Sequence, residues 1–232
     1  MTIKIFADTA NIEEIISLSK NDKISGFTTN PLLLAKGGVK NYVDFAKEVM
    51  KHVDGWPVSF EVLSDDISEM KDQALKISEW GSSIYVKIPV MNTKAMHTYN
   101  LMNELIVQGI KVNATAITTY DQIQNSVSAL KSKTVPSIVS VFAGRIADTG
   151  INPEYIIKYA VDYCSMNNVQ VLWASSREMY NVYQADELGV DIITLTPDLI
   201  KKLELKGKDL ELVSQETVKL FYDNALRSGY VL

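Results

Sequence analysis

The stretch Ile84–Val90, with the sequence IYVKIPV, is an apolar run that carries one charged residue, Lys87. Bounded by the Gly-Ser-Ser turn at residues 81–83 and by Pro89, it predicts a short strand buried on both faces, as in a parallel sheet. Burial pushes a lysine toward its neutral amine, which is a nucleophile for carbonyl carbons. The alternative is a lysine at a strand end whose amine reaches solvent.

The composition describes a globular protein with a substantial core. The chain has 232 residues, of which 47% are hydrophobic and 22% charged. Its net charge of −5 gives no support for binding nucleic acid or a membrane, so an anionic ligand needs a local cluster of positive charge. The single cysteine, Cys164, excludes an internal disulfide and fits a reducing compartment. We expect no signal peptide and no membrane span, and therefore a cytoplasmic protein.

Short β-rich runs alternate with amphipathic stretches along the whole chain. The expected strands are Ile3–Ala7, Gly26–Thr29, Val58–Leu63, Ile84–Ile88, Lys111–Ala116, Ser137–Ala143, Gln170–Ala174 and Asp191–Leu195. The expected helices are Ile12–Lys20, Tyr42–Val53, Ile67–Trp80, Lys94–Gln108, Tyr120–Lys131, Pro153–Met166, Arg177–Leu188, Pro197–Leu203 and Leu210–Leu226. This alternation predicts an α/β fold, a single (β/α)8 TIM barrel over residues 1–232 in which 208–232 form an extra C-terminal helix and tail. An open doubly wound sheet is the alternative, but no G-x-G-x-x-G loop follows the first strand.

Strand parity predicts which side chains point into the barrel. Side chains alternate between the two faces of a strand, and in a closed barrel one face points inward. Val86 and Ile88 suit the helix-facing side, so Lys87 is predicted to point inward with Tyr85. The other predicted inward pairs are Phe6 and Asp8, Thr28 and Asn30, Ser59 and Glu61, Asn113 and Thr115, Ser140 and Phe142, Trp173 and Ser175, and Thr194 and Thr196. The polar members gather at the carboxyl ends of the strands, where barrel enzymes carry their active sites, which favours a catalytic Lys87.

An inward lysine with two carboxylates suits Schiff-base chemistry. The Lys87 amine would attack a carbonyl, and the resulting iminium would accept electrons from an adjacent carbon–carbon bond as it breaks. Asp8 and Glu61 would move protons, with Thr115 holding a water between them. Asp8 has an alternative role as a helix N-cap, although Asn11 or Thr9 caps the same helix at least as plausibly.

Two arginines follow the sixth and seventh expected strands. Arg145 and Arg177, together with Ser175, would form a clamp for a sugar phosphate, since arginine forks match phosphate oxygens. The alternative is a solvated surface pair. The two histidines, His52 and His97, fall in expected helices without metal-ligand spacing, and we expect neither a metal nor a cofactor.

Six segments together resemble the transaldolase family, in its small-subunit branch that also contains fructose-6-phosphate aldolases. They are Phe6–Asn11 (FADTAN), Thr28–Pro31 (TTNP), Val86–Pro89 (VKIP), Asn113–Ala116 (NATA), Ser140–Ile146 (SVFAGRI) and Ala174–Arg177 (ASSR). The resemblance implies that Lys87 forms a Schiff base with a ketose phosphate while Asp8, Glu61 and Thr115 handle protons and a catalytic water. It also implies a substrate-binding set that comprises Thr28, Asn30, Asn113, Ser140, Phe142, Arg145, Ser175 and Arg177.

Two positions separate the branches of this family. The similar aldolases usually carry glutamine at the position of Glu61 and tyrosine at that of Phe142, whereas transaldolases carry glutamate and phenylalanine, as here. A phenylalanine keeps that flank dry, so the enamine waits for an aldehyde acceptor. The chain departs from the family pattern at Val141, where proline is common, and at Ala147, where an acidic residue beside the phosphate arginine is common.

The leading hypothesis is therefore a transaldolase that moves dihydroxyacetone from sedoheptulose 7-phosphate or fructose 6-phosphate to an aldose phosphate. One alternative is an aldolase that releases free dihydroxyacetone, and another is a non-catalytic sugar-phosphate-binding barrel. The partners expected are sugar phosphates, with no nucleic acid and no membrane. The resemblance further implies a homo-oligomer, a pentamer or decamer.

Overall fold

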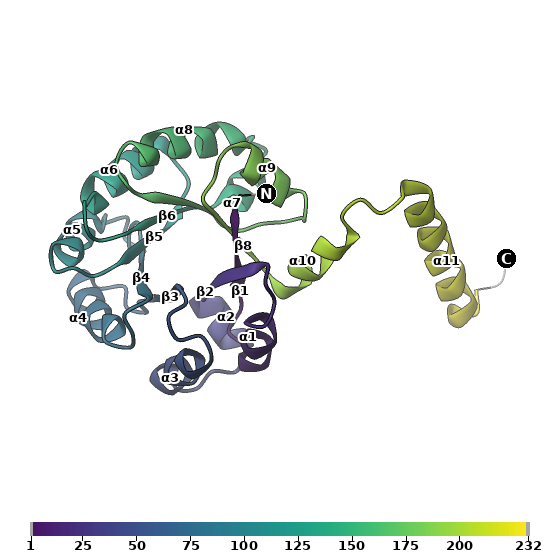
Figure 1. The fold of residues 1–232 in the computed structure, drawn as a ribbon, viewed down its shortest axis with the longest axis horizontal. Helices are drawn as coiled ribbons and strands as arrows, with labels where there is room; N and C mark the ends of the chain where they lie inside the picture. The colour runs from purple at the N-terminus through teal and green to yellow at the C-terminus, as the bar shows by residue number, and fades with distance from the viewer. Residues whose placement is uncertain (1, 231–232) are drawn as a thin grey trace. The chain divides into compact units, whose positions relative to one another are not determined.

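The computed structural model of the chain describes residues 2–230 and contains a closed barrel of parallel strands (Figure 1). The strands are β1 (Lys4–Asp8), β2 (Ile24–Thr28), β3 (Val58–Glu61), β4 (Ile84–Pro89), β5 (Val112–Ile117), β6 (Ile138–Val141), β7 (Gln170–Trp173) and β8 (Ile192–Leu195). Each strand pairs with the next along the chain, and β8 pairs with β1. The predicted (β/α)8 fold is confirmed.

The helices follow the predicted alternation, and most of those within residues 2–200 lie around the strands (Figure 1). They are α1 (Ile12–Leu18), α2 (Pro31–Lys36), α3 (Tyr42–His52), α4 (Ile67–Ser78), α5 (Tyr99–Val107), α6 (Tyr120–Leu130), α7 (Ala143–Ala147), α8 (Glu154–Ser165), α9 (Asn181–Glu187) and α10 (Pro197–Lys201), followed by a 3-10 turn (Lys202–Leu205) and α11 (Leu210–Ser228). Side-chain oxygens of Asn11, Asn41 and Asp66 cap α1, α3 and α4 by accepting backbone N–H groups of the first turn.

Three local predictions about helices were wrong. The short helices α2 and α7 were not predicted, and α7 begins at Ala143, the last residue of the expected sixth strand. The helix expected from Lys94 begins only at Tyr99, because the preceding loop closes an isolated bridge between Met91 and His97. His97 therefore lies in this loop and not in a helix.

Below the carboxyl ends of the strands, the barrel interior contains a cluster of buried apolar side chains. The cluster comprises Phe6, Tyr85, Ile138, Leu172, Ala174 and Ile192. Leu172 pairs in register with Ser140, so β7 turns Leu172 inward and Trp173 toward the helices. The prediction of an inward Trp173 was wrong, because the parity of β7 is set by its register with β6.

The chain divides into two compact units, Met1–Ile200 and Lys201–Leu232. The second contains α11, which Asp209 caps and which ends at Gly229 in the left-handed conformation. No residue of α11 is buried. The last two residues of the predicted 208–232 segment lie outside the described residues. No helix within residues 2–230 is both long and apolar enough to cross a membrane.

Candidate active site

A cavity of about 440 Å³ opens at the carboxyl ends of the strands. Eleven of the twelve residues predicted for the site line it, namely Asp8, Thr28, Asn30, Glu61, Lys87, Thr115, Ser140, Phe142, Arg145, Ser175 and Arg177. They come from seven strands or the loops that follow them, so closure of the barrel brings together residues far apart in the sequence. The remaining one, Asn113, does not line the cavity.

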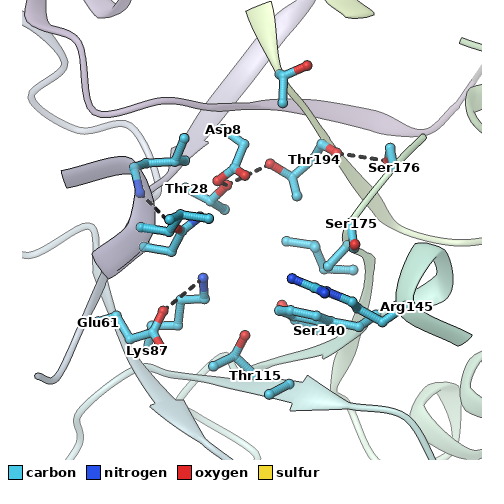
Figure 2. A pocket seen from close by; sticks show the side chains of 18 of the residues that line it. Asp8, Thr28, Glu61, Lys87, Thr115, Ser140, Arg145, Ser175, Ser176 and Thr194 are labelled. Atoms are coloured by element: carbon cyan, nitrogen blue, oxygen red, sulfur yellow. Dashed lines mark hydrogen bonds and ion pairs between the residues drawn. The ribbon is translucent and has the colours of Figure 1, made fainter. Parts of the chain in front are cut away.

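Lys87 and Glu61 form the charged centre of this cavity (Figure 2). Their Cα atoms pair in register on β4 and β3, and the Lys87 amine lies 3.1 Å from Glu61 Oε2. The amine also donates to the Thr29 carbonyl at 3.0 Å. The Lys87 side chain is 7% exposed and that of Glu61 15%, so the alternative in which Lys87 reaches solvent is wrong. Each buried charge has its partner, as burial requires.

Asp8 lines the cavity, and its carboxylate is linked by hydrogen bonds to two threonine hydroxyls. Thr28 Oγ1 donates to Asp8 Oδ1 at 2.7 Å and lies 2.6 Å from Thr194 Oγ1. Burial raises the pKa of the Asp8 carboxyl above its ordinary value, although the positive charge of Lys87 and the Thr28 hydrogen bond oppose this shift. Asn11 caps α1, so Asp8 is not needed as a cap.

Asn113 lies below the cavity, where both its amide nitrogen and its amide oxygen are hydrogen-bonded to neighbouring side chains. Its Nδ2 donates to Ser59 Oγ at 3.0 Å, and its Oδ1 accepts from Ser140 Oγ at 2.7 Å. All three side chains are essentially inaccessible to solvent. Asn113 therefore fixes the orientation of Ser140, which does line the cavity.

The end of β5 is irregular at the wall of the cavity. The pairing of β5 with β6 shifts register between Ala114 and Ile117, and Ala116 has a φ of 61°. Bulges of this kind redirect side chains beside active sites. The Thr115 hydroxyl is buried without a hydrogen-bond partner in the described chain, and it points toward the cavity from the strand next to that of Lys87 (Figure 2). It is available to bind a water or a substrate oxygen.

The opposite wall carries the positive charge expected for an anion. Arg145 lies on α7, and Figure 2 shows it beside Ser140 and Ser175. Arg177 donates from Nε to Asp148 Oδ1 at 3.3 Å and forms a second, shorter contact through Nη2. Asp148 thus supplies a carboxylate for Arg177 although position 147 is alanine, and this ion pair lowers the pKa of Asp148.

A close approach of two backbones shapes this wall. Ser175 has a φ of 63° and follows the end of β7, so it reaches the cavity from a loop and not by strand parity. A Cβ atom added to Gly144 would lie 1.8 Å from the Ser175 carbonyl oxygen. Only glycine permits α7 to lie this close to the Ser175 loop.

Several lining residues were not among the predicted site residues. They include Pro31, Leu32, Leu33 and Lys36 of α2, together with Ser176, Thr194 and Thr196. Ser176 Oγ donates to the Thr194 carbonyl at 3.0 Å, which joins the loop after β7 to β8. The Asn30-Pro31 pair is a signal that could have found α2, since Asn30 caps this helix and Pro31 is its first residue. Within residues 2–230, no group of three or more histidine, cysteine, aspartate or glutamate residues could hold a metal ion.

The family described as Transaldolase/Fructose-6-phosphate aldolase matches residues 5–228 of this chain. The chain belongs to this family. As a transaldolase/aldolase family member, it is similar to a protein of Clostridioides difficile (strain 630) named "Probable transaldolase", with 34% identity over 203 residues that cover 87% of this chain and 89% of that protein. A protein with the same name from Thermoplasma volcanium is 35% identical over 207 residues, which cover 87% of each chain. The family match and these relatives support an enzyme of the transaldolase/aldolase class.

Solved structures resemble this family member in fold alone. N-acetylneuraminate lyase from Mycoplasma synoviae superposes with a TM-score of 0.56 at 13% identity, covering 97% of this chain and 83% of that one. A truncated 3-deoxy-D-arabino-heptulosonate 7-phosphate synthase from Thermotoga maritima gives a TM-score of 0.55 at 13% identity, covering 84% and 74%. At this identity the likeness supports the barrel architecture and carries no information on substrates.

Proposed function

We propose that the protein is a cytoplasmic transaldolase. It would transfer a dihydroxyacetone unit from sedoheptulose 7-phosphate or fructose 6-phosphate to an aldose phosphate through a Schiff base on Lys87. The observation that carries this proposal is the buried Lys87 amine, which faces the cavity within 3.1 Å of Glu61. Family membership supports the same class of chemistry.

The first half of the reaction forms the Schiff base and breaks the donor sugar. Glu61 takes a proton from the Lys87 ammonium, and the resulting neutral amine attacks the ketose carbonyl. The carbinolamine then loses water as Glu61 and a water held by Thr115 move protons. Asp8 then takes the proton of the C4 hydroxyl while the C3–C4 bond breaks. The electrons of the C3–C4 bond flow into the iminium to give an enamine, and the aldose phosphate leaves.

The second half runs these steps in reverse with the acceptor. The enamine carbon attacks the acceptor aldehyde, Asp8 returns its proton to the new hydroxyl, and water hydrolyses the iminium to release the product. Asn30 and Ser140 would bind hydroxyls of the dihydroxyacetone unit, with Thr28 orienting Asp8. Arg145, Ser175 and Arg177 would hold the phosphate.

Phe142 favours transfer over release of free dihydroxyacetone. It lines the cavity and packs on the apolar cluster within the barrel. Because a phenylalanine ring has no hydroxyl, this part of the wall offers the enamine no proton donor. An aldolase would need a proton delivered to the nucleophilic carbon of the enamine. The test is turnover of fructose 6-phosphate with and without erythrose 4-phosphate: a transaldolase forms sedoheptulose 7-phosphate and is nearly idle without acceptor. Rapid release of glyceraldehyde 3-phosphate without acceptor would favour the aldolase, and no turnover of either kind would favour a binding barrel.

Self-association is part of the same proposal. Helix α11 exposes large apolar side chains, among them Leu220, Phe221 and Leu226. Cover from other copies of the chain would remove this surface from water, as in the expected pentamer or decamer. Light scattering coupled to size-exclusion chromatography tests this expectation, and a monomer at micromolar concentration would contradict it.

A further inference from the structure

The ladder between β2 and β3 stops one hydrogen bond short of the active site. Phe27 N–H donates to the Pro57 carbonyl at 2.9 Å, and Thr29 N–H donates to the Ser59 carbonyl at 3.1 Å. Continued in the same parallel pattern, the Glu61 N–H would donate to the Thr29 carbonyl. Instead, that carbonyl accepts from the Lys87 amine at 3.0 Å. The amine thus occupies the acceptor that the ladder would otherwise use.

The Tyr42 hydroxyl occupies the place of the missing ladder bond. It accepts from the Glu61 N–H at 2.9 Å and donates to the Glu61 carbonyl at 3.1 Å. Tyr42 is the first residue of α3, and its ring is held edge-on against Trp80 with centroids 5.3 Å apart. Burial raises the pKa of the Tyr42 phenol above its ordinary value, so the hydroxyl remains a donor throughout the working pH range.

We propose that Tyr42 is a positioning residue for the chemistry of Lys87 and Glu61. Its hydroxyl fixes the Glu61 backbone and satisfies the Glu61 N–H, which leaves the Thr29 carbonyl to orient the lysine amine. One side chain outside the cavity lining thereby sets the position of two groups inside it. This inference rests on the proposed Schiff-base function.

Loss of the hydroxyl affects both groups at once. In Tyr42→Phe the Glu61 N–H has no partner, and the nearest acceptor in the parallel pattern is the Thr29 carbonyl. Pairing there would draw Glu61 toward β2 and compete with Lys87 for the same oxygen. A misplacement of about 1 Å in a catalytic group costs up to roughly 100-fold in rate. The phosphate-binding wall on α7 and the Ser175 loop makes no contact with Tyr42 through these bonds, so substrate affinity should change little.

The experiment compares Tyr42→Phe with wild type and with the matched control Tyr159→Phe. The control removes a hydroxyl that accepts from Gln124 Nε2 at 2.5 Å, on α8 and outside the cavity lining. Borohydride trapping with saturating fructose 6-phosphate counts the Lys87 sites that form a Schiff base, and kcat for transfer is expressed per trapped site. This normalisation removes any misfolded fraction from the comparison.

We expect Tyr42→Phe to retain trapping at Lys87, to lose tenfold or more in kcat, and to keep KM within twofold of wild type, with Tyr159→Phe unchanged. A kcat per trapped site equal to that of Tyr159→Phe would overturn the inference, and so would a rise in KM at constant kcat. Absence of any adduct in the wild-type enzyme would instead overturn the proposed function, so the two failures are distinguishable.

Discussion

Gly144→Ala tests whether the close approach of α7 to the Ser175 loop builds the phosphate wall. The new Cβ would lie 1.8 Å from the Ser175 carbonyl oxygen, so the two backbones must separate by about 1.2 Å to reach the shortest tolerable contact. Ser175 already has a φ of 63°, and a backbone oxygen has no rotamer by which to escape. Overpacking of this kind costs about 1–3 kcal/mol of unfolding free energy, which corresponds to several degrees in Tm for a chain of this size.

The displacement also moves Ser175 relative to Arg145, which is the neighbour of Gly144. We therefore expect KM for phosphorylated sugars to rise by about tenfold or more, while kinetics with dihydroxyacetone and glyceraldehyde change much less. Gly81→Ala is the control, because its Cβ would meet the end of the flexible Met50 side chain at 3.0 Å. The assay is steady-state kinetics with both substrate types beside a thermal melt. A KM within twofold of wild type, or an equal loss for both substrate types, would refute the reasoning.

Three further predictions follow from the site. Asp8→Asn should abolish transfer yet raise the unfolding free energy relative to wild type, and the difference should grow as pH rises above 3.8. The cause is the raised pKa of Asp8 in the folded state, which makes ionised Asp8 progressively costly to the native protein. Chemical denaturation from pH 4 to 7 checks this, and a difference that is constant in pH would contradict it. Arg177→Ala should raise KM for sugar phosphates at least tenfold and leave unphosphorylated substrates nearly unaffected, whereas equal losses would mean a structural role. Phe142→Tyr should increase acceptor-free release of glyceraldehyde 3-phosphate from fructose 6-phosphate, and unchanged partitioning would argue against the dry-flank explanation.

Most of the barrel could be predicted from the sequence because β-rich runs alternate with amphipathic stretches, and polar residues with apolar neighbours mark the inward face of several strands. Asp8, Glu61 and Lys87 each mark the parity of their own strand. In β7 the only polar residue is Gln170, at the first position of the strand, whereas Leu172 and Trp173 near the carboxyl end are both apolar. Their direction is decided by register with β6. The strand also ends at Trp173, so parity could not be extended to Ser175, which a left-handed backbone brings to the cavity.

Short helices and hydrogen bonds between distant side chains were harder to predict from the sequence. Helices α2 and α7 have six and five residues, too few for a periodic apolar pattern to stand out. Asn113 was assigned to substrate binding through its motif, whereas in the structure its amide nitrogen and oxygen are hydrogen-bonded to Ser59 and Ser140 below the cavity. The contacts of Tyr42 could not be predicted at all, since a tyrosine at the start of a helix gives no indication that its hydroxyl reaches another strand.

The most direct test of the central claim is to identify the residue that binds the substrate covalently. Borohydride reduction during turnover of fructose 6-phosphate, followed by peptide mass mapping, should place the reduced adduct on the peptide that carries Lys87. Lys87→Arg should give no adduct and no transfer, because a guanidinium stays protonated at any working pH and cannot form the imine. An adduct on a different lysine, or transfer activity that survives in Lys87→Arg, would contradict the account.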